Sequence, residues 1–157
     1  LLRAVAGFSA LALATIAAYL HGYRTPAEHG SIVVDLQTHL VDTMQFVILL
    51  LGAPFRWLAG SGRFGDAVGV AAGCAYLALW LGAAITVLRA RGRHAAQAAA
   101  WMFATYVLAT ASITAAGRTL AFGVESALWS RYTTAAVWGW AALGLWVKAQ
   151  PSKKVNW

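Results

Sequence analysis

Charge is scarce in this sequence. Charged residues make up 11% of its 157 residues, whereas a soluble domain usually carries about 25%. Hydrophobic residues make up 61%. The composition therefore argues against a water-soluble fold and predicts an integral membrane protein, with room for at most about five spans of about 20 residues.

Cysteine is nearly absent. The single cysteine, Cys74, lies in an apolar run and leaves no partner for an intramolecular disulfide and no basis for a cysteine-rich metal site. The formal net charge of +7 comes from 12 Lys and Arg residues that stand in short tracts between apolar runs. This pattern is typical of contact with anionic lipid headgroups. We therefore expect the bilayer as a partner and no nucleic acid.

The start of the chain lacks the signs of a cleaved signal peptide. The first apolar run, about residues 4–20, is not followed by an A-x-A type cleavage site and a polar mature domain. We therefore expect a retained span. Because the first residue is Leu1 rather than Met, we also expect that the chain is processed or belongs to a longer protein.

Four apolar runs predict full spans over about residues 4–20, 66–88, 95–116 and 132–148. A fifth run, Met44 to Phe55, contains Gly52 and Pro54 and would rise only about 18 Å as a helix, against a hydrocarbon core of roughly 30 Å. Extension to about residues 40–58 would give a full span. The predicted fold class is all-α, a single-domain polytopic transmembrane helix bundle over residues 1–157, with four full spans plus one short half-inserted or fifth helix.

Charged residues are also missing from the middle of the predicted spans. This absence argues against a proton-coupled pump or a channel with a charged filter. The run over residues 95–116 is instead rich in Ala, Thr and Ser, which let membrane helices approach closely and hydrogen-bond to one another.

The distribution of Lys and Arg predicts the orientation in the membrane. With residues 40–58 not crossing, the 12 basic residues divide seven to five between the two sides. The positive-inside rule then favours cytoplasmic N- and C-termini in a bacterial inner membrane. The connection at residues 89–94 is expected in the cytoplasm and the connection at residues 117–133 outside, whether or not residues 40–58 cross.

The outward segment over about residues 117–131 is amphipathic. If it is helical, one face carries Arg118, Phe122, Glu125, Trp129 and Tyr132. Arg118, Glu125 and Arg131 are then candidate ligands for an anionic headgroup, phosphate or sugar. In the alternative interpretation, the segment is an interfacial helix whose Arg side chains reach phospholipid phosphates.

A second polar cluster precedes the short apolar run. The spacing of His39 and Asp42 would bring the two side chains together on a helix, as a proton carrier or as an ordinary interfacial hydrogen bond. The spacing matches no metal motif, and we predict no cofactor and no catalytic residue. As an alternative, His21, His29 or His39 could ligate haem or the magnesium of chlorophyll, although none is centred in a strong span. The candidate outer cluster consists of Tyr23, Arg24, His29, Asp35, His39 and Asp42.

The segment GRTLAFGVESALWSRYTT, with the upstream HGYRTP and LLLGAPF, resembles the C-terminal region of large uncharacterised bacterial polytopic membrane proteins. Those proteins carry a pattern like G-R-x-x-F-G-x-x-x-A-x-x-S-R-Y-T-T between their last spans, although Phe122 stands one position later here. The resemblance implies membrane glycosyltransferases that use polyprenyl-phosphate sugars. Because their catalytic acid lies in an early loop of a much longer chain, no catalytic role is carried over. The matching residues are Gly117, Arg118, Phe122, Gly123, Ala127, Ser130, Arg131, Tyr132, Thr133 and Thr134.

Three functional hypotheses follow. The first is an accessory or structural membrane subunit, or the non-catalytic C-terminal bundle of a larger membrane protein, which would contact other membrane subunits. The alternative is a module of an enzyme that acts on a lipid-linked or sugar-phosphate substrate at the outer face. A transporter component is the third.

Overall fold

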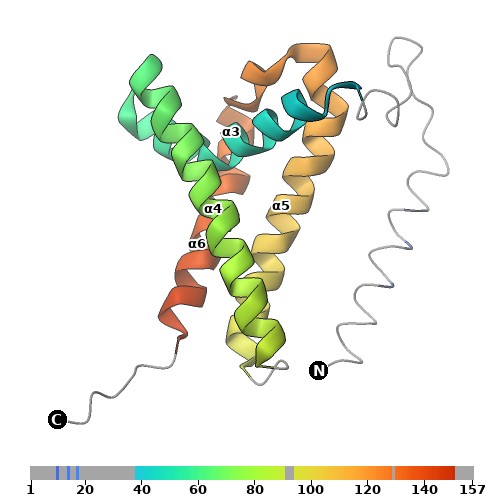
Figure 1. The fold of residues 1–157 in the computed structure, drawn as a ribbon, viewed down its shortest axis with the longest axis vertical. Coiled ribbons are helices and arrows are strands. Elements are labelled where there is room, and N and C mark those ends of the chain that lie inside the picture. Colours follow the sequence, from blue (N-terminus) through green and yellow to red (C-terminus); the bar gives the residue numbers. More distant parts are fainter. Residues whose placement is uncertain are drawn as a thin grey trace. The chain divides into compact units, whose positions relative to one another are not determined.

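The computed structural model describes residues 38–90, 94–128 and 130–150, together with residues 10, 14 and 17 (Figure 1). The chain divides into two units, Leu1–Ser31 and Ile32–Trp157, and the fold below is that of the second. Its described part has no strand, so the all-α helix bundle is confirmed. The elements are α3 (Leu40–Ala59), α4 (Arg63–Arg89), α5 (Ala95–Phe122), the 3-10 helix η1 (Val124–Leu128) and α6 (Ser130–Lys148).

Three helices in the described part of the chain are long and apolar enough to cross a membrane: Leu40–Ala59, Arg63–Arg89 and Ala95–Thr119. This finding supports a membrane protein and, for the described part of the chain, corrects the predicted set of full spans. The predicted span over residues 132–148 forms α6, which is less apolar than these three helices because its first turns contain Ser, Arg, Tyr and Thr. The predicted span over residues 4–20 lies outside the described residues, apart from three isolated positions.

Helix α3 is longer than its apolar run suggests. It is continuous over 20 residues, with Pro54 inside it, and therefore rises about 30 Å, the thickness of a hydrocarbon core. Proline lacks the N–H that would bond to the carbonyl of Leu50. The neighbouring Leu51 carbonyl accepts a hydrogen bond from Trp140 Nε1 at 2.9 Å. Figure 1 shows α3 running across the other three helices rather than along them.

Glycines join α3 to α4 backbone to backbone. Gly65, Gly69 and Gly73 follow one another at every fourth position and are buried on one side of α4. A Cβ atom on Gly73 would overlap the carbonyl oxygen of Ile48, and a Cβ atom on Gly52 would overlap that of Gly69. Small residues at this spacing allow such a close approach of two membrane helices. We call this contact the glycine corner.

Helices α4, α5 and α6 pack instead through side chains. Ala104, Ala111 and Ala115 are fully buried on α5 and face a core that includes Tyr76. The Tyr76 hydroxyl donates to the Ala104 carbonyl at 2.9 Å, which confirms the predicted close packing of this Ala-rich helix. Several hydroxyls bond only within their own helix, as Thr110 does to Tyr106.

The bundle has two chemically different ends. At the hairpin end, where α4 connects to α5, Gln97 Nε2 donates to the Ala149 carbonyl at 2.9 Å and thereby joins the start of α5 to the end of α6. Arg89 and Lys148 lie in the last turns of their helices there. At the opposite end, which carries η1 and which we call the η1 end, lie the three acidic residues in the described part of the chain, Asp42, Asp66 and Glu125.

Candidate functional site

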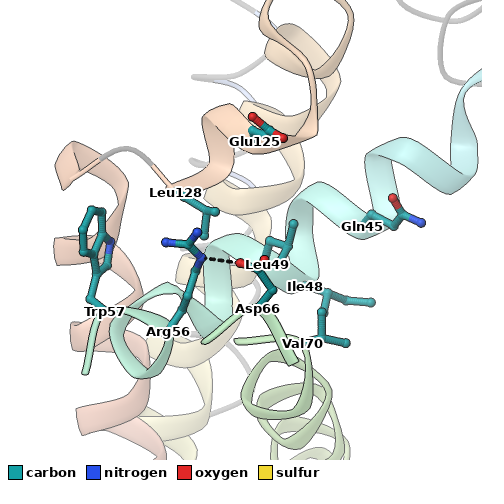
Figure 2. A pocket seen from close by; sticks show the side chains of 9 residues that line it. All are labelled: Gln45, Ile48, Leu49, Arg56, Trp57, Asp66, Val70, Glu125 and Leu128. Atoms are coloured by element: carbon teal, nitrogen blue, oxygen red, sulfur yellow. Dashed lines mark hydrogen bonds and ion pairs between the residues drawn. The ribbon is translucent and has the colours of Figure 1, made fainter. Parts of the chain in front are cut away.

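A groove of about 960 Å³ opens at the η1 end between α3, the start of α4 and η1 (Figure 2). Its wall combines one guanidinium, two carboxylates and an amide with aliphatic side chains and an indole. A wall of this kind suits a ligand that is itself partly polar and partly apolar. The lining residues are Gln45, Ile48, Leu49, Arg56, Trp57, Asp66, Val70, Glu125 and Leu128.

The centre of the groove is an ion pair between two helices. Arg56 in the last turn of α3 donates from Nε to Asp66 Oδ1 in the first turn of α4, at 2.7 Å. The Arg56 side chain is 17% exposed and that of Asp66 is 51% exposed. The Arg56 Cβ lies 3.1 Å from where a Cβ on Gly69 would stand, so the glycine corner leaves room for the arginine stem. The guanidinium also lies 5.8 Å from the Trp57 ring centroid.

The pair of Arg56 and Asp66 was not predicted from the sequence. The sequence nevertheless contains a sign of this pair, because Arg56 and Asp66 are 10 positions apart and two glycines, Gly60 and Gly62, lie between them. These glycines have φ values of 89° and 106°, which are accessible to glycine and strained for other residues. A short connection with two such glycines brings the end of one helix to the start of the next.

Glu125 lies at the rim of the groove because helix α5 ends just before this residue. Helix α5 ends at Phe122, Gly123 has a φ of 72°, and η1 begins at Val124. Ser126 Oγ donates to the Gly123 carbonyl at 2.9 Å and fixes this turn. Within the described residues, the exposed Glu125 carboxylate forms no hydrogen bond or ion pair.

The predicted helical face of residues 118–132 is interrupted at Gly123, although three of its residues, Arg118, Phe122 and Tyr132, lie together. The Arg118 guanidinium lies over the rings of Phe122 and Tyr132, with its central carbon 5.4 Å and 5.7 Å from their centroids. The turn at Gly123 sends Glu125 into the groove instead, where it lies with Arg56. No ion pair joins Arg118 to Glu125 in the described part of the chain, and the side chain of Arg131 lies outside the described residues.

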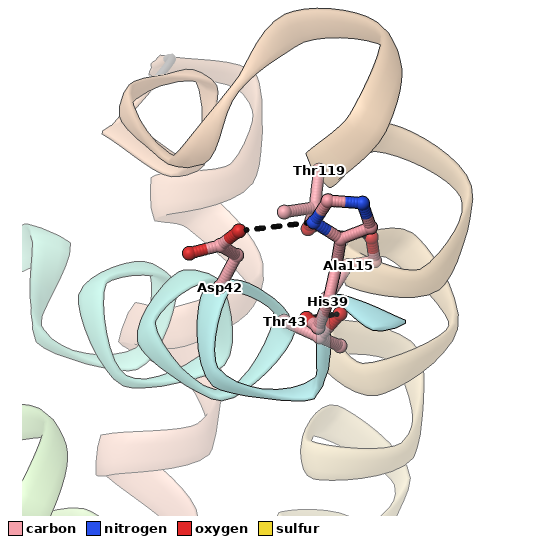
Figure 3. A network of polar contacts seen from close by, with 5 residues as sticks. All are labelled: His39, Asp42, Thr43, Ala115 and Thr119. Atoms are coloured by element: carbon pink, nitrogen blue, oxygen red, sulfur yellow. Dashed lines mark hydrogen bonds and ion pairs between the residues drawn. The ribbon is translucent and has the colours of Figure 1, made fainter. Parts of the chain in front are cut away.

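The predicted contact between His39 and Asp42 is confirmed. His39 Nδ1 and Asp42 Oδ2 are 3.3 Å apart, and the side chains are 46% and 50% exposed. Thr43 Oγ1 donates to the His39 carbonyl at 3.0 Å in the same turn (Figure 3). This exposed pair stands at the start of α3, and the described residues contain no group of three His, Cys, Asp or Glu that could hold a metal ion. Tyr23, Arg24, His29 and Asp35 lie outside the described residues.

A second, apolar cavity of about 390 Å³ lies between α3, α4 and α5. Ile48 is the lining residue that it shares with the groove among the described residues. The residues that line this cavity are Thr43, Met44, Val47, Ile48, Leu77, Ser112, Ile113 and Ala116.

Comparisons with protein-family models, with curated proteins and with solved structures found no match. The fold and the groove themselves define the class. This chain is an all-α membrane protein whose helix bundle carries a mixed polar and apolar groove at one end.

Proposed function

We propose that this chain is a non-catalytic accessory module of a bacterial inner membrane, either a structural subunit or the C-terminal bundle of a larger membrane protein. The observation that supports this role is the 2.7 Å pair between Arg56 and Asp66. It occupies the centre of the groove and joins α3 to α4 where their backbones touch. The most buried charge of the groove thus serves the packing of the bundle.

Partners for this module are the bilayer and other membrane helices. Large apolar side chains lie exposed on the helices, among them Tyr106 at 67%, Ile113 at 65% and Leu145 at 62%. Such side chains would be unfavourable in water and need lipid or another helix beside them. Arg89 and Lys148 at the hairpin end favour contact with anionic headgroups.

We propose that the hairpin end faces the cytoplasm together with both termini, and that the η1 end faces outward. The seven-to-five division of the 12 basic residues of the whole sequence supports this orientation through the positive-inside rule. The direction of α3 across the other helices supports a half-inserted position for α3 at the outer surface, although α3 is long and apolar enough to cross a membrane.

Two variants test the accessory role. Arg118→Ala and Glu125→Ala are introduced into the full chain in its native membrane, and assembly and any sugar transfer from polyprenyl-phosphate donors are measured. The accessory role predicts that Glu125→Ala leaves assembly and transfer unchanged and that Arg118→Ala changes assembly alone, because it removes the contact with Tyr132. Loss of transfer in correctly assembled protein would overturn the role.

The groove itself favours a second candidate function, a module of a membrane enzyme that acts on a lipid-linked or sugar-phosphate substrate at the outer face. The supporting observation is that the groove combines charged side chains with the aliphatic side chains of Leu49, Val70 and Leu128, which matches a ligand with a polar head and a hydrocarbon tail. For this candidate, Glu125→Ala would abolish transfer while leaving the bundle assembled.

A further inference from the structure

We propose that the groove at the η1 end retains a zwitterionic phospholipid whose head carries a primary ammonium, with the ammonium at Glu125 and the phosphate at Arg56. Such retention requires neither catalysis nor a protein partner. A failed retention test would therefore leave the accessory role standing.

The charges of the groove select against a purely anionic head. Among the described lining residues, one guanidinium faces two carboxylates, which gives these residues an excess of one negative charge. Asp66 already neutralises Arg56 at 2.7 Å, and the exposed Glu125 carboxylate lacks an ionic partner within the described residues. An anionic lipid would add like charge to this wall, whereas an ammonium supplies the missing cation and three N–H donors.

Arg56 still has donors to offer to a phosphate. Its Nε bonds to Asp66, and the planar guanidinium carries four further N–H groups on its two Nη atoms. Arginine binds phosphate oxygens through such paired N–H groups. The packing of its stem over Gly69 and its ion pair hold the guanidinium in place before a ligand arrives, which lowers the entropy lost on binding.

The aliphatic side of the groove provides the surface for the hydrocarbon tail. Ile48, Leu49, Val70 and Leu128 form this apolar wall beside the charged side chains. A soluble head without a tail would leave this wall uncovered. The combination therefore indicates a membrane lipid rather than a free phosphorylated amine. Trp57, which is 55% exposed at the groove, has the amphipathic ring that favours the headgroup level of a bilayer.

Native mass spectrometry of the detergent-purified full chain tests the proposal. The protein is incubated with equal amounts of phosphatidylethanolamine and phosphatidylglycerol that carry identical acyl chains. We expect the wild type to retain phosphatidylethanolamine about fivefold more than phosphatidylglycerol, since one partly exposed charge contact changes affinity by a modest factor. Equal retention of the two lipids, or preference for phosphatidylglycerol, would overturn the proposal.

Two matched variants assign the preference to the groove. Glu125→Gln keeps the size of the exposed side chain and should bring the ratio of the two lipids close to one. Asp42→Asn removes an acidic residue at the same end that does not line the groove, and it should keep the ratio. A preference that survives Glu125→Gln, or is lost equally in Asp42→Asn, would contradict the assignment of the ammonium to Glu125.

Competition with free phosphoethanolamine distinguishes a membrane lipid from a soluble head group as the occupant of the groove. Added at the same concentration as the lipid, it should leave bound phosphatidylethanolamine in place, because it cannot cover the apolar wall beside Ile48. Displacement of the lipid by this soluble head would overturn the choice of a membrane lipid as occupant.

Discussion

The two helix contacts of this bundle are built on opposite principles. At the glycine corner, α3 and α4 touch through their backbones, and no side chain stands between Gly73 and the Ile48 carbonyl. Between α4, α5 and α6, side chains fill the space, and Tyr76 and Trp80 donate hydrogen bonds to α5 at 2.9 Å. The contact between α3 and α4 therefore has no room for a residue larger than glycine. The contact between α4, α5 and α6 is instead weakened when a single hydrogen-bonding group is removed.

This difference explains where the groove lies. Because the glycine corner brings α3 close to α4, Arg56 reaches Asp66 directly at the groove. The side-chain core holds α5 and α6 in position, and Trp140 on α6 connects it to α3 through the Leu51 carbonyl at 2.9 Å.

The largest expected effect comes from one methyl group in the glycine corner. Gly73→Ala should destabilise the bundle by about 2 kcal/mol, because the new Cβ would overlap the Ile48 carbonyl and force the helices apart. Gly82→Ala in the same helix is the matched control. None of the described residues lies within 4 Å of a Cβ at Gly82, so the higher helix propensity of Ala should stabilise the bundle by up to about 1 kcal/mol. Thermal unfolding in detergent measures the stability of both variants. Equal changes in stability would contradict the claim that the glycine corner has no room for a larger residue.

A smaller effect is expected in the side-chain core. Tyr76→Phe keeps the buried ring and removes the hydroxyl that donates to the Ala104 carbonyl, which should destabilise the bundle by about 1 kcal/mol. Tyr106→Phe, at a side chain that is 67% exposed, is the control and should change little. The same thermal assay distinguishes them. A larger loss of stability for Tyr76→Phe than for Gly73→Ala would contradict the prediction that the glycine corner is the more sensitive contact.

The smallest effect is expected for the ion pair of the groove. Asp66→Asn removes the charge but keeps a carbonyl oxygen that can accept from Arg56, and the Asp66 side chain is 51% exposed. Solvent screening limits the loss to about 0.5 kcal/mol. The difference from the wild type should shrink as salt is raised from low to high concentration. A loss of stability that salt does not reduce would contradict an electrostatic role of Asp66 and would indicate that its side chain acts through packing.

Much of the fold could be predicted from the sequence. The apolar runs at residues 66–88 and 95–116 correspond to α4 and α5, and the extended run at residues 40–58 corresponds to α3. The length of α3 was underestimated because Gly52 and Pro54 suggested an interruption. The backbone contact at Gly52 and the bond from Trp140 to the Leu51 carbonyl involve other helices, so local sequence rules could not show them.

The candidate site was predicted less well. Glu125 does line the groove, whereas Arg118 lies against two aromatic rings. The prediction continued the helical periodicity past Gly123 and so placed Glu125 and Arg118 on one face. A glycine in the left-handed region can, however, end a helix at that position. The repeat of Gly65, Gly69 and Gly73 was readable from spacing alone and would have indicated the glycine corner.

Labelling of single cysteines in intact bacteria tests most directly whether the two ends of the bundle lie on opposite sides of a membrane. With Cys74→Ala as background, Glu125→Cys probes the η1 end and His94→Cys probes the hairpin end, both at exposed positions. A membrane-impermeant maleimide should label Glu125→Cys in intact cells and His94→Cys only after the inner membrane is permeabilised. Labelling of both cysteines from the same side would contradict the account.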